Sequence, residues 1–236
     1  MPHFHGMTLQ WLGHASFHVQ TARGTSILID PWVESNPACP KDWKAPEKVD
    51  LVLCTHGHGD HIGDALSVEK KYHPTFVGIY ELVGWLSSKG VKKTVGMNLG
   101  GTFRFHDVNI SMVEAKHSSS IEENGTSTYA GEPAGYVLRV DGEPAIYHAG
   151  DTALFSDMKL VRELYAPDIA CLPIGDHYTM GPRAAAMAAN FVGCKKVVPI
   201  HYGTFPALTG TPAELRKHLE GTQIEVLPIE PGERLQ

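Results

Sequence analysis

The residues with the clearest chemical potential lie in one short segment of the chain. His56, His58, Asp60 and His61 form the pattern H-x-H-x-D-H, with glycine at both x positions. A tight loop after a strand turns alternate side chains to one side, so His56 and His58 can bind one ion while Asp60 and His61 reach a second. Nitrogen and carboxylate ligands suit zinc, and also iron or manganese. Because chance produces such a pattern in about one chain in several hundred, it predicts a metal site.

The elements around this segment predict how it is held. The segment 49–54, which is continuously apolar after Asp50, is typical of a buried strand, and the motif leads into a predicted helix over 60–71. Short strands fill the first third of the chain, and hairpins alternate with strand–helix units after it. This order predicts a single α+β domain over 1–236, in which two mixed sheets pack face to face with helices on both outer faces. Residues 1–6 are expected to form a flexible N-terminus.

Several other segments give local predictions. The polar composition of 118–133 predicts a loop, and a helix is predicted over 153–165. Thr211, Pro212 and Glu214 form a capping box with proline at the first helical position, which predicts a helix start. The histidines interpreted as surface or packing residues are His3, His5, His18, His73, His106 and His218.

Composition favours some classes of protein over others. The formal net charge of −6 gives no indication of a nucleic-acid partner. No apolar run approaches the ~20 residues that span a bilayer, and the first ten residues lack the pattern of a signal peptide. We therefore expect a cytoplasmic protein with a small-molecule substrate, no nucleic-acid partner and no stable membrane association. The oligomeric state stays open, and the four cysteines are expected to be reduced.

The segment 53–61, Leu-Cys-Thr-His-Gly-His-Gly-Asp-His, resembles the signature loop of the metallo-β-lactamase superfamily. Further landmarks of that superfamily recur in order: Asp30 in Leu-Ile-Asp-Pro-Trp, His117 in Lys-His-Ser, Asp151 in His-Ala-Gly-Asp-Thr and His201 in Pro-Ile-His-Tyr. The resemblance covers nearly the whole chain. It implies the four-layer αββα sandwich that the order of elements also predicts.

The resemblance implies a site for two divalent ions, with zinc preferred and manganese or iron as alternatives. The implied ligands are His56, His58 and His117 for one ion, Asp60, His61 and His201 for the other, and Asp151 as the bridge between them. Two ions ~3.5–4 Å apart lower the pKa of a shared water and generate hydroxide near pH 7. Asp30 is interpreted as a structural hydrogen-bonding residue. Some true β-lactamases carry cysteine near the position of Asp151, so antibiotic hydrolysis is not favoured.

Two further segments are similar to a narrower branch of the superfamily. Residues 11–15, Trp-Leu-Gly-His-Ala, resemble ascorbate-6-phosphate lactonases, a group of small metal-dependent hydrolases and N-acyl-phosphatidylethanolamine phospholipase D. The loop 173–182 strengthens the match to the small hydrolases. The resemblance makes His14 a candidate substrate-binding residue and His177 a candidate acid, although either can instead be a histidine bonded to backbone. Tyr178 and Tyr202 are candidate donors to an oxyanion, or packing residues.

These residues predict metal-assisted hydrolysis of a small ester or lactone, with or without a phosphate group. Asp60 would orient the attacking hydroxide and carry a proton. The first alternative is a phosphodiesterase like the phospholipase D branch. The second is a protein that binds metal without catalysis. A di-iron redox enzyme is a third, but such relatives usually carry glutamate where His58 stands and an added flavin domain.

Overall fold

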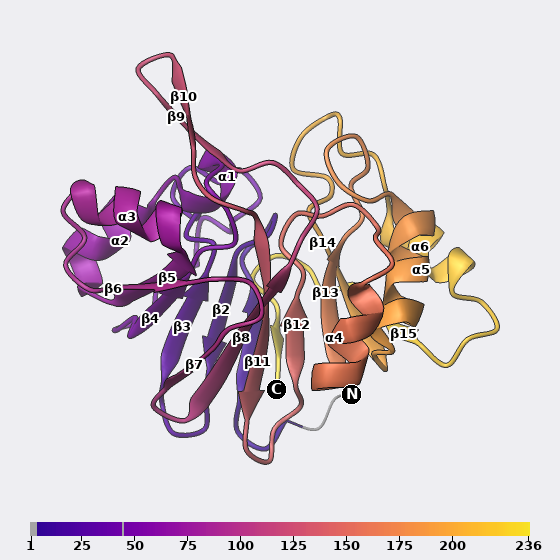
Figure 1. Cartoon of the computed structure of the whole chain (residues 1–236). Helices are drawn as coiled ribbons and strands as arrows, with labels where there is room; N and C mark the ends of the chain where they lie inside the picture. Colours follow the sequence, from indigo (N-terminus) through magenta and orange to yellow (C-terminus); the bar gives the residue numbers. More distant parts are fainter. Residues whose placement is uncertain (1–3, 44) are drawn as a thin grey trace.

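The computed structural model describes residues 4–43 and 45–236, which form two mixed sheets packed face to face. Figure 1 shows helices on the outer face of each sheet, so the predicted α+β, four-layer αββα sandwich is confirmed. His3 and the start of the predicted flexible N-terminus lie outside the described residues. His5 is exposed, as the sequence predicts.

The first sheet joins an antiparallel half to a parallel half. Its strands are β1 (Thr8–Trp11), β2 (Phe17–Gln20), β3 (Ser26–Ile29), β4 (Leu51–Leu53), β5 (Thr75–Ile79), β6 (Thr94–Met97) and β16 (Arg234–Leu235). In the described residues their order is β16-β1-β2-β3-β4-β5-β6, and the pairing becomes parallel from β3 onward. The helices on this side are α1 (Gly59–Ile62), α2 (Ala65–Tyr72) and α3 (Tyr80–Ser88).

The second sheet has the same mixed pattern. Its strands are β7 (Thr102–Phe105), β8 (Val108–Glu114), β11 (Ala134–Val140), β12 (Ile146–His148), β13 (Ile169–Pro173), β14 (Lys196–Ile200) and β15 (Glu225–Val226). Their order is β15-β14-β13-β12-β11-β8-β7, with parallel pairing from β12 to β15. The helices on this side are α4 (Met158–Tyr165), α5 (Pro182–Val192) and α6 (Pro212–His218). None of the described helices is long and apolar enough to cross a membrane.

Both faces of the second sheet are buried at its central strands, where alternate residues belong to different cores. In β11, Tyr136 and Leu138 pack into the core between the sheets, whereas Val137 packs under the helices. This alternation is the two-residue period of a strand. The small side chains of α5, among them Ala185 and Ala188, are buried against the outer face. The four cysteines, all within the described residues, are free, in agreement with the predicted reduced state.

The capping box predicted at the last helix is present. Glu214 N donates to Thr211 Oγ1 at 3.3 Å, and Thr211 N donates to Glu214 Oε2 at 3.0 Å. The helix predicted over 60–71, in contrast, is broken into α1 and α2. Asp64 lies at the break, and its carboxylate accepts from Val33 N at 2.6 Å and Glu34 N at 2.7 Å. A tertiary contact to the loop after β3 therefore overrides the local helical pattern.

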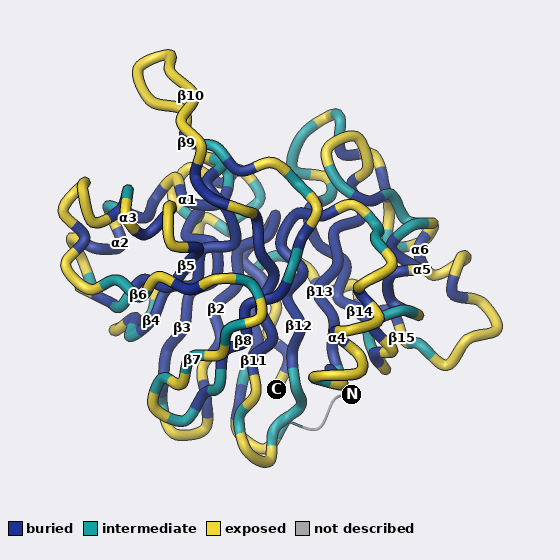
Figure 2. Tube along the Cα trace, in the orientation of Figure 1, coloured by how far each residue is buried: buried dark blue, intermediate teal, exposed yellow. Residues whose placement is uncertain are grey.

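Two other local predictions are wrong. The loop predicted over 118–133 contains the hairpin of β9 (Ser120–Glu123) and β10 (Thr126–Tyr129). The hairpin projects from the body of the protein and is largely exposed (Figures 1 and 2), so its strands lack the apolar alternation by which strands are recognised. The helix predicted over 153–165 begins only at Met158, because the chain before it is bonded to the segment that follows β8, where Ala153 N donates to Lys116 O.

His18 is a buried packing residue and not a surface histidine. It lies in β2 with 5% of its surface exposed, and its Nε2 is 2.9 Å from Ser26 Oγ on β3. Burial, with a smaller contribution from the charge of Arg234, lowers the pKa of His18 from 6.5 to about 4. The folded chain therefore holds this imidazole in its neutral form down to acidic pH.

This burial predicts a pH dependence of stability. As pH falls from about 6.5 to about 4, the unfolded chain takes up a proton at His18 while the folded chain does not. The free energy of unfolding should fall in this window by about 3 kcal/mol from this residue alone. In urea unfolding, the free energy of unfolding should be lower at pH 4.5 than at pH 7.5, and His18→Gln should make this difference smaller by the contribution of His18. The exposed-site control, His218→Gln, should keep it; equal pH dependence in all three proteins would contradict the assignment.

Candidate metal centre

The predicted ligands come from different elements but meet at one end of the sandwich. His56 and His58 follow β4, and Asp60 and His61 lie in α1. The other three follow strands of the second sheet: His117 after β8, Asp151 after β12 and His201 after β14. β8, β12 and β14 run in the same direction, so their carboxyl ends lie at the same edge, where ligand sites of such sheets commonly form.

The first cluster consists of His56, His58 and His117, whose ring nitrogens lie within 4.8 Å of one another. His56 Nε2 is 3.0 Å from His58 Nδ1, and the other ring nitrogen of His58 is 3.4 Å from Ser118 Oγ. Burial lowers the pKa of all three histidines. Neutral imidazoles are the form that binds a metal ion, so this cluster fits the predicted ligands of the first ion.

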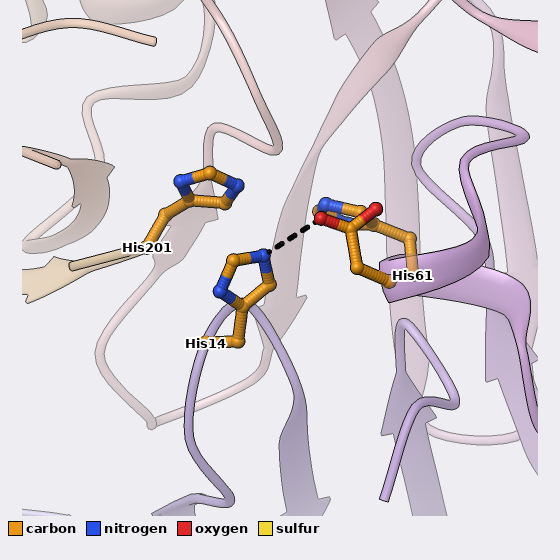
Figure 3. Close-up of side chains that lie close together, drawn as sticks. His14, His61 and His201 are labelled. Atoms are coloured by element: carbon orange, nitrogen blue, oxygen red, sulfur yellow. Dashed lines mark hydrogen bonds and ion pairs between the residues drawn. The ribbon is translucent and has the colours of Figure 1, made fainter. Parts of the chain in front are cut away.

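The second cluster consists of Asp60, His61, His201 and His14, with ligand atoms again within 4.8 Å of one another. Figure 3 shows the side chains of His14, His61 and His201 close together. His14 Nε2 is also 3.1 Å from Asp60 Oδ2. The first three are the predicted ligands of the second ion. His14, predicted as a substrate-binding residue, has a side chain with no exposed surface and lies among them.

Asp151 lies between the two clusters. Its Oδ2 is 3.0 Å from His201 Nε2, 3.3 Å from His61 Nε2 and 3.6 Å from His117 Nε2. Burial would raise the pKa of Asp151, but the charges of His201 and His61 outweigh burial and hold the pKa well below its usual value. An ionised carboxylate that contacts ligands of both clusters is placed as the predicted bridge requires.

Buried atoms without partners test whether these residues fit metal ions. Within the described residues, His61 Nε2 and His201 Nε2 face Asp151 Oδ2 at 3.3 and 3.0 Å without making a hydrogen bond, and Asp151 Oδ1 is buried without any hydrogen bond. Buried polar atoms that lack a hydrogen bond usually cost about 1–3 kcal/mol each. Burial lowers the pKa of His61, yet Asp151 and Asp30 outweigh it and hold the pKa well above its usual value. Buried nitrogen and oxygen atoms without hydrogen bonds, together with several carboxylates at one point, are the environment that a divalent cation would satisfy, so the residues fit the predicted ions.

Asp30 controls which nitrogens face this point. Its Oδ2 is 2.8 Å from His61 Nδ1 and accepts from Thr55 Oγ1 at 2.8 Å, and Oδ1 accepts from Thr55 N at 2.8 Å. Because its hydroxyl proton is donated to Asp30, Thr55 Oγ1 is left to accept from His56 Nδ1 at 3.0 Å. Both histidines then carry a proton on Nδ1, so Nε2 is the nitrogen that each of them turns to the site for a metal ion. This agrees with the predicted hydrogen-bonding role of Asp30 and extends it to two ligands.

The structure does not bring all predicted residues to this centre. His177 and Tyr178 are exposed in the loop after β13, where their rings pack at 4.4 Å. Within the described residues, neither side chain has a hydrogen bond or ion pair with a predicted ligand. Tyr202 stacks on Trp11 at 5.5 Å, and burial raises its pKa to about 12. The roles predicted for these residues stay predictions.

Sequence reasoning also missed residues that contact the ligands. Thr55 lies inside the signature segment, but nothing in its type distinguishes it there. Thr204, which is 3.0 Å from His14, follows His201 in a loop without a recognisable pattern. His148 is buried and bonded to backbone on both nitrogens, at Ala15 O and Gly150 N. A cavity of about 470 Å³ under the loop 33–46 is lined by none of the predicted ligands.

Known metal-dependent hydrolases resemble this chain over nearly its whole length. Residues 25–202 match a family model described as the β-lactamase superfamily domain. A metal-dependent hydrolase of Koribacter versatilis is 53% identical over 97% of both chains. Another from Methanopyrus kandleri is 46% identical, over 96% of this chain and 98% of the relative. The metallo hydrolase Igni18 from Ignicoccus hospitalis has 38% identity and a TM-score of 0.86 over 97% of both chains.

A more distant structure shares the fold alone. CmlA, a diiron β-hydroxylase from Streptomyces venezuelae, is 17% identical with a TM-score of 0.76. The match covers this whole chain but only 55% of CmlA. The αββα sandwich thus occurs in proteins with different chemistry, and the site residues must decide the function of this one.

Metal content tests the two clusters. We expect about two ions per chain in zinc-supplied protein, measured by elemental mass spectrometry. His58→Ala, which removes one ligand of the first cluster, should lower the content to about one. Asp151→Ala should lower it to one or less, because this residue contacts both clusters, while His218→Gln should match the wild type. No bound metal after supply of zinc, manganese and anaerobic iron, or two ions in every variant, would refute the assignment.

A second test concerns Asp30. Asparagine tolerates the left-handed backbone here, where φ is 49°, but it offers one acceptor oxygen where Asp30 offers two. Asp30→Asn should therefore weaken the binding of both ions by about 10–100-fold in chelator competition, because both histidine tautomers depend on this carboxylate. The exposed-site control, Asp157→Asn, should bind as the wild type does. Unchanged affinity in Asp30→Asn would mean that the tautomers are fixed in another way.

Proposed function

The chain belongs to the β-lactamase superfamily as a metal-dependent hydrolase, and we propose that it uses two divalent ions to cleave a small ester or lactone, with or without a phosphate group. The observation that carries the two-ion proposal is the position of Asp151, whose Oδ2 contacts histidines of both clusters. Zinc is the proposed metal because the ligands are nitrogens and carboxylates, with manganese or iron as alternatives.

His56, His58 and His117 would hold one ion, and Asp60, His61 and His201 the other, with Asp151 between them. When bound, such a pair lowers the pKa of a water molecule and stabilises negative charge that develops on the substrate. The burial of the proposed ligands shows on which side the site is open to solvent. Most of these ligands are buried, but the Asp60 side chain is 29% exposed and His58 and His117 are partly exposed. We therefore place the substrate over these three residues.

Asp60 is the proposed residue for orienting the attacking water. Burial would raise its pKa, but the hydrogen bond from His14 and the charge of His61 outweigh burial and hold the pKa well below its usual value. An ionised carboxylate accepts a hydrogen bond from water and fixes its direction. His177, in the loop after β13 at the same sheet edge, stays the proposed acid for the leaving group.

The carbonyl substrate is favoured by two features of the chain. The loop 173–182 strengthens the similarity to the small hydrolases, whereas segment 11–15 resembles lactonases and the phospholipase D branch alike; the net charge of −6 gives no support for a nucleic-acid substrate. Tyr202, with its pKa near 12, keeps its hydroxyl proton at neutral pH and can donate to a developing oxyanion. Tyr178 is proposed as a second substrate contact from the exposed loop after β13.

A substrate panel with zinc-loaded protein tests this function. Lactones, phosphorylated sugar lactones and p-nitrophenyl esters should be hydrolysed with higher kcat/KM than bis(p-nitrophenyl) phosphate. His58→Ala and Asp151→Ala should lower kcat/KM by about 10³-fold or more, equivalent to ~4 kcal/mol, because ion binding is lost. His218→Gln should leave it unchanged. A higher kcat/KM for the phosphodiester would favour the phosphodiesterase alternative. If protein loaded with two ions hydrolyses none of these substrates, a protein that binds metal without catalysis is favoured.

A further inference from the structure

His14 is held in place by more contacts than a substrate-binding side chain needs. Its backbone lies in the left-handed region, with φ at 55°, which a residue other than glycine rarely adopts. Its carbonyl accepts from Trp11 Nε1 and from His201 N, both at 3.0 Å. The ring packs against those of His201, at 3.9 Å between centroids, and Trp32, at 5.2 Å. Strain that the surroundings enforce in this way commonly marks a functional position.

Both ring nitrogens of His14 have partners. Nε2 is 3.1 Å from Asp60 Oδ2, and Nδ1 is 3.0 Å from Thr204 Oγ1. An ionised carboxylate can only accept, so Nε2 carries the proton in this contact. A neutral imidazole has a single proton, which leaves Nδ1 to accept from the Thr204 hydroxyl. The three side chains thus form one directed chain of hydrogen bonds, from Thr204 through His14 to Asp60.

We propose that His14 is a positioning residue, which Thr204 keeps in the Nε2–H tautomer and which holds Asp60 Oδ2 so that the other carboxylate oxygen is left for the second ion. This inference rests on the proposed function only in treating Asp60 as a metal ligand. His14 thus does for Asp60 what Asp30 does for His56 and His61. Asp60 needs such a partner, since it lies in the four-residue helix α1 and is 29% exposed.

The competing role for His14 is direct metal coordination, because its ring lies within ligand distance of Asp60, His61 and His201. That role would need the opposite tautomer, with the proton on Nδ1 and donated to Thr204. The Nε2 lone pair would then face Asp60 Oδ2 at 3.1 Å, which is repulsive unless a cation lies between them. Asp60, His61 and His201, with Asp151 shared, already supply four donors, the number that zinc commonly takes.

Two pairs of variants separate these roles in a zinc titration with a competing chelator. His14→Gln keeps a donor but is a poor zinc ligand, whereas His14→Phe keeps only a ring. We expect His14→Phe to lower the affinity for the second ion by about 10–100-fold. His14→Gln should keep most of the wild-type affinity. Thr204→Val should also lower the affinity for the second ion, whereas Thr204→Ser, which keeps the hydroxyl, should leave this affinity unchanged. The binding constant of the first ion in each titration is the internal control.

Two outcomes would overturn the proposal. If His14→Gln loses the second ion as completely as Asp60→Ala does, His14 is a ligand. If His14→Phe leaves both binding constants unchanged, His14 does not position Asp60.

A second readout does not depend on activity or on the number of ions. Two-bond ¹H–¹⁵N NMR spectra of the histidine rings should show His14 as the Nε2–H tautomer in wild-type protein, with a changed shift in Thr204→Val. His14 protonated on Nδ1 would contradict the proposal. Should the wild type bind fewer than two ions, the binuclear function fails, and the tautomer still decides whether Thr204 and His14 form the directed chain.

Discussion

The Asp30 carboxylate is the interaction on which the metal centre depends most. It lies directly after β3, and the parallel register of β3 with β4 places it beside Thr55, since Ile29 pairs with Leu53. Asp30 N also donates to Leu53 O at 2.9 Å. Through Thr55 and His61 the carboxylate then fixes ring tautomers at both clusters. A shift of one residue in this strand pairing would separate Asp30 from its partners, so the sheet register is a condition for the site.

Burial and charge oppose each other at this centre. Asp30 and Asp151 are almost fully buried, and placing carboxylates there without compensation is costly. Neighbouring histidines compensate part of this charge, but Asp151 Oδ1 makes no hydrogen bond, which indicates that the compensation among side chains is incomplete. Three residues of the centre, His14, Asp30 and His201, also adopt left-handed backbone. The two apolar cores on either side supply the stability against which this strain is held.

The sequence predicted those parts of the structure that depend on neighbours in the chain. The signature segment, the buried strands and the capping box at Thr211 are local patterns, and each has its expected structure. The break between α1 and α2 depends on Asp64 reaching Val33, which no local pattern contains. The contact of His14 with Thr204 joins residues 190 positions apart, and neither residue type indicates the other. The exposed hairpin of β9 and β10 has no apolar face for a pattern to show.

The two clusters differ in how firmly their ligands are held and in how open they are. In the second cluster, His61 and His201 are buried, His61 is bonded to Asp30, and Asp60 is bonded to His14. In the first, His58 and His117 are partly exposed. A reacting group can approach only where solvent can, so the open side of the site lies over the first cluster and Asp60. In the proposed mechanism Asp60 then has two tasks, because it would bind the buried ion and would also orient the incoming water. A carboxylate with both tasks must have one oxygen fixed, and the buried imidazole of His14 is placed to do this.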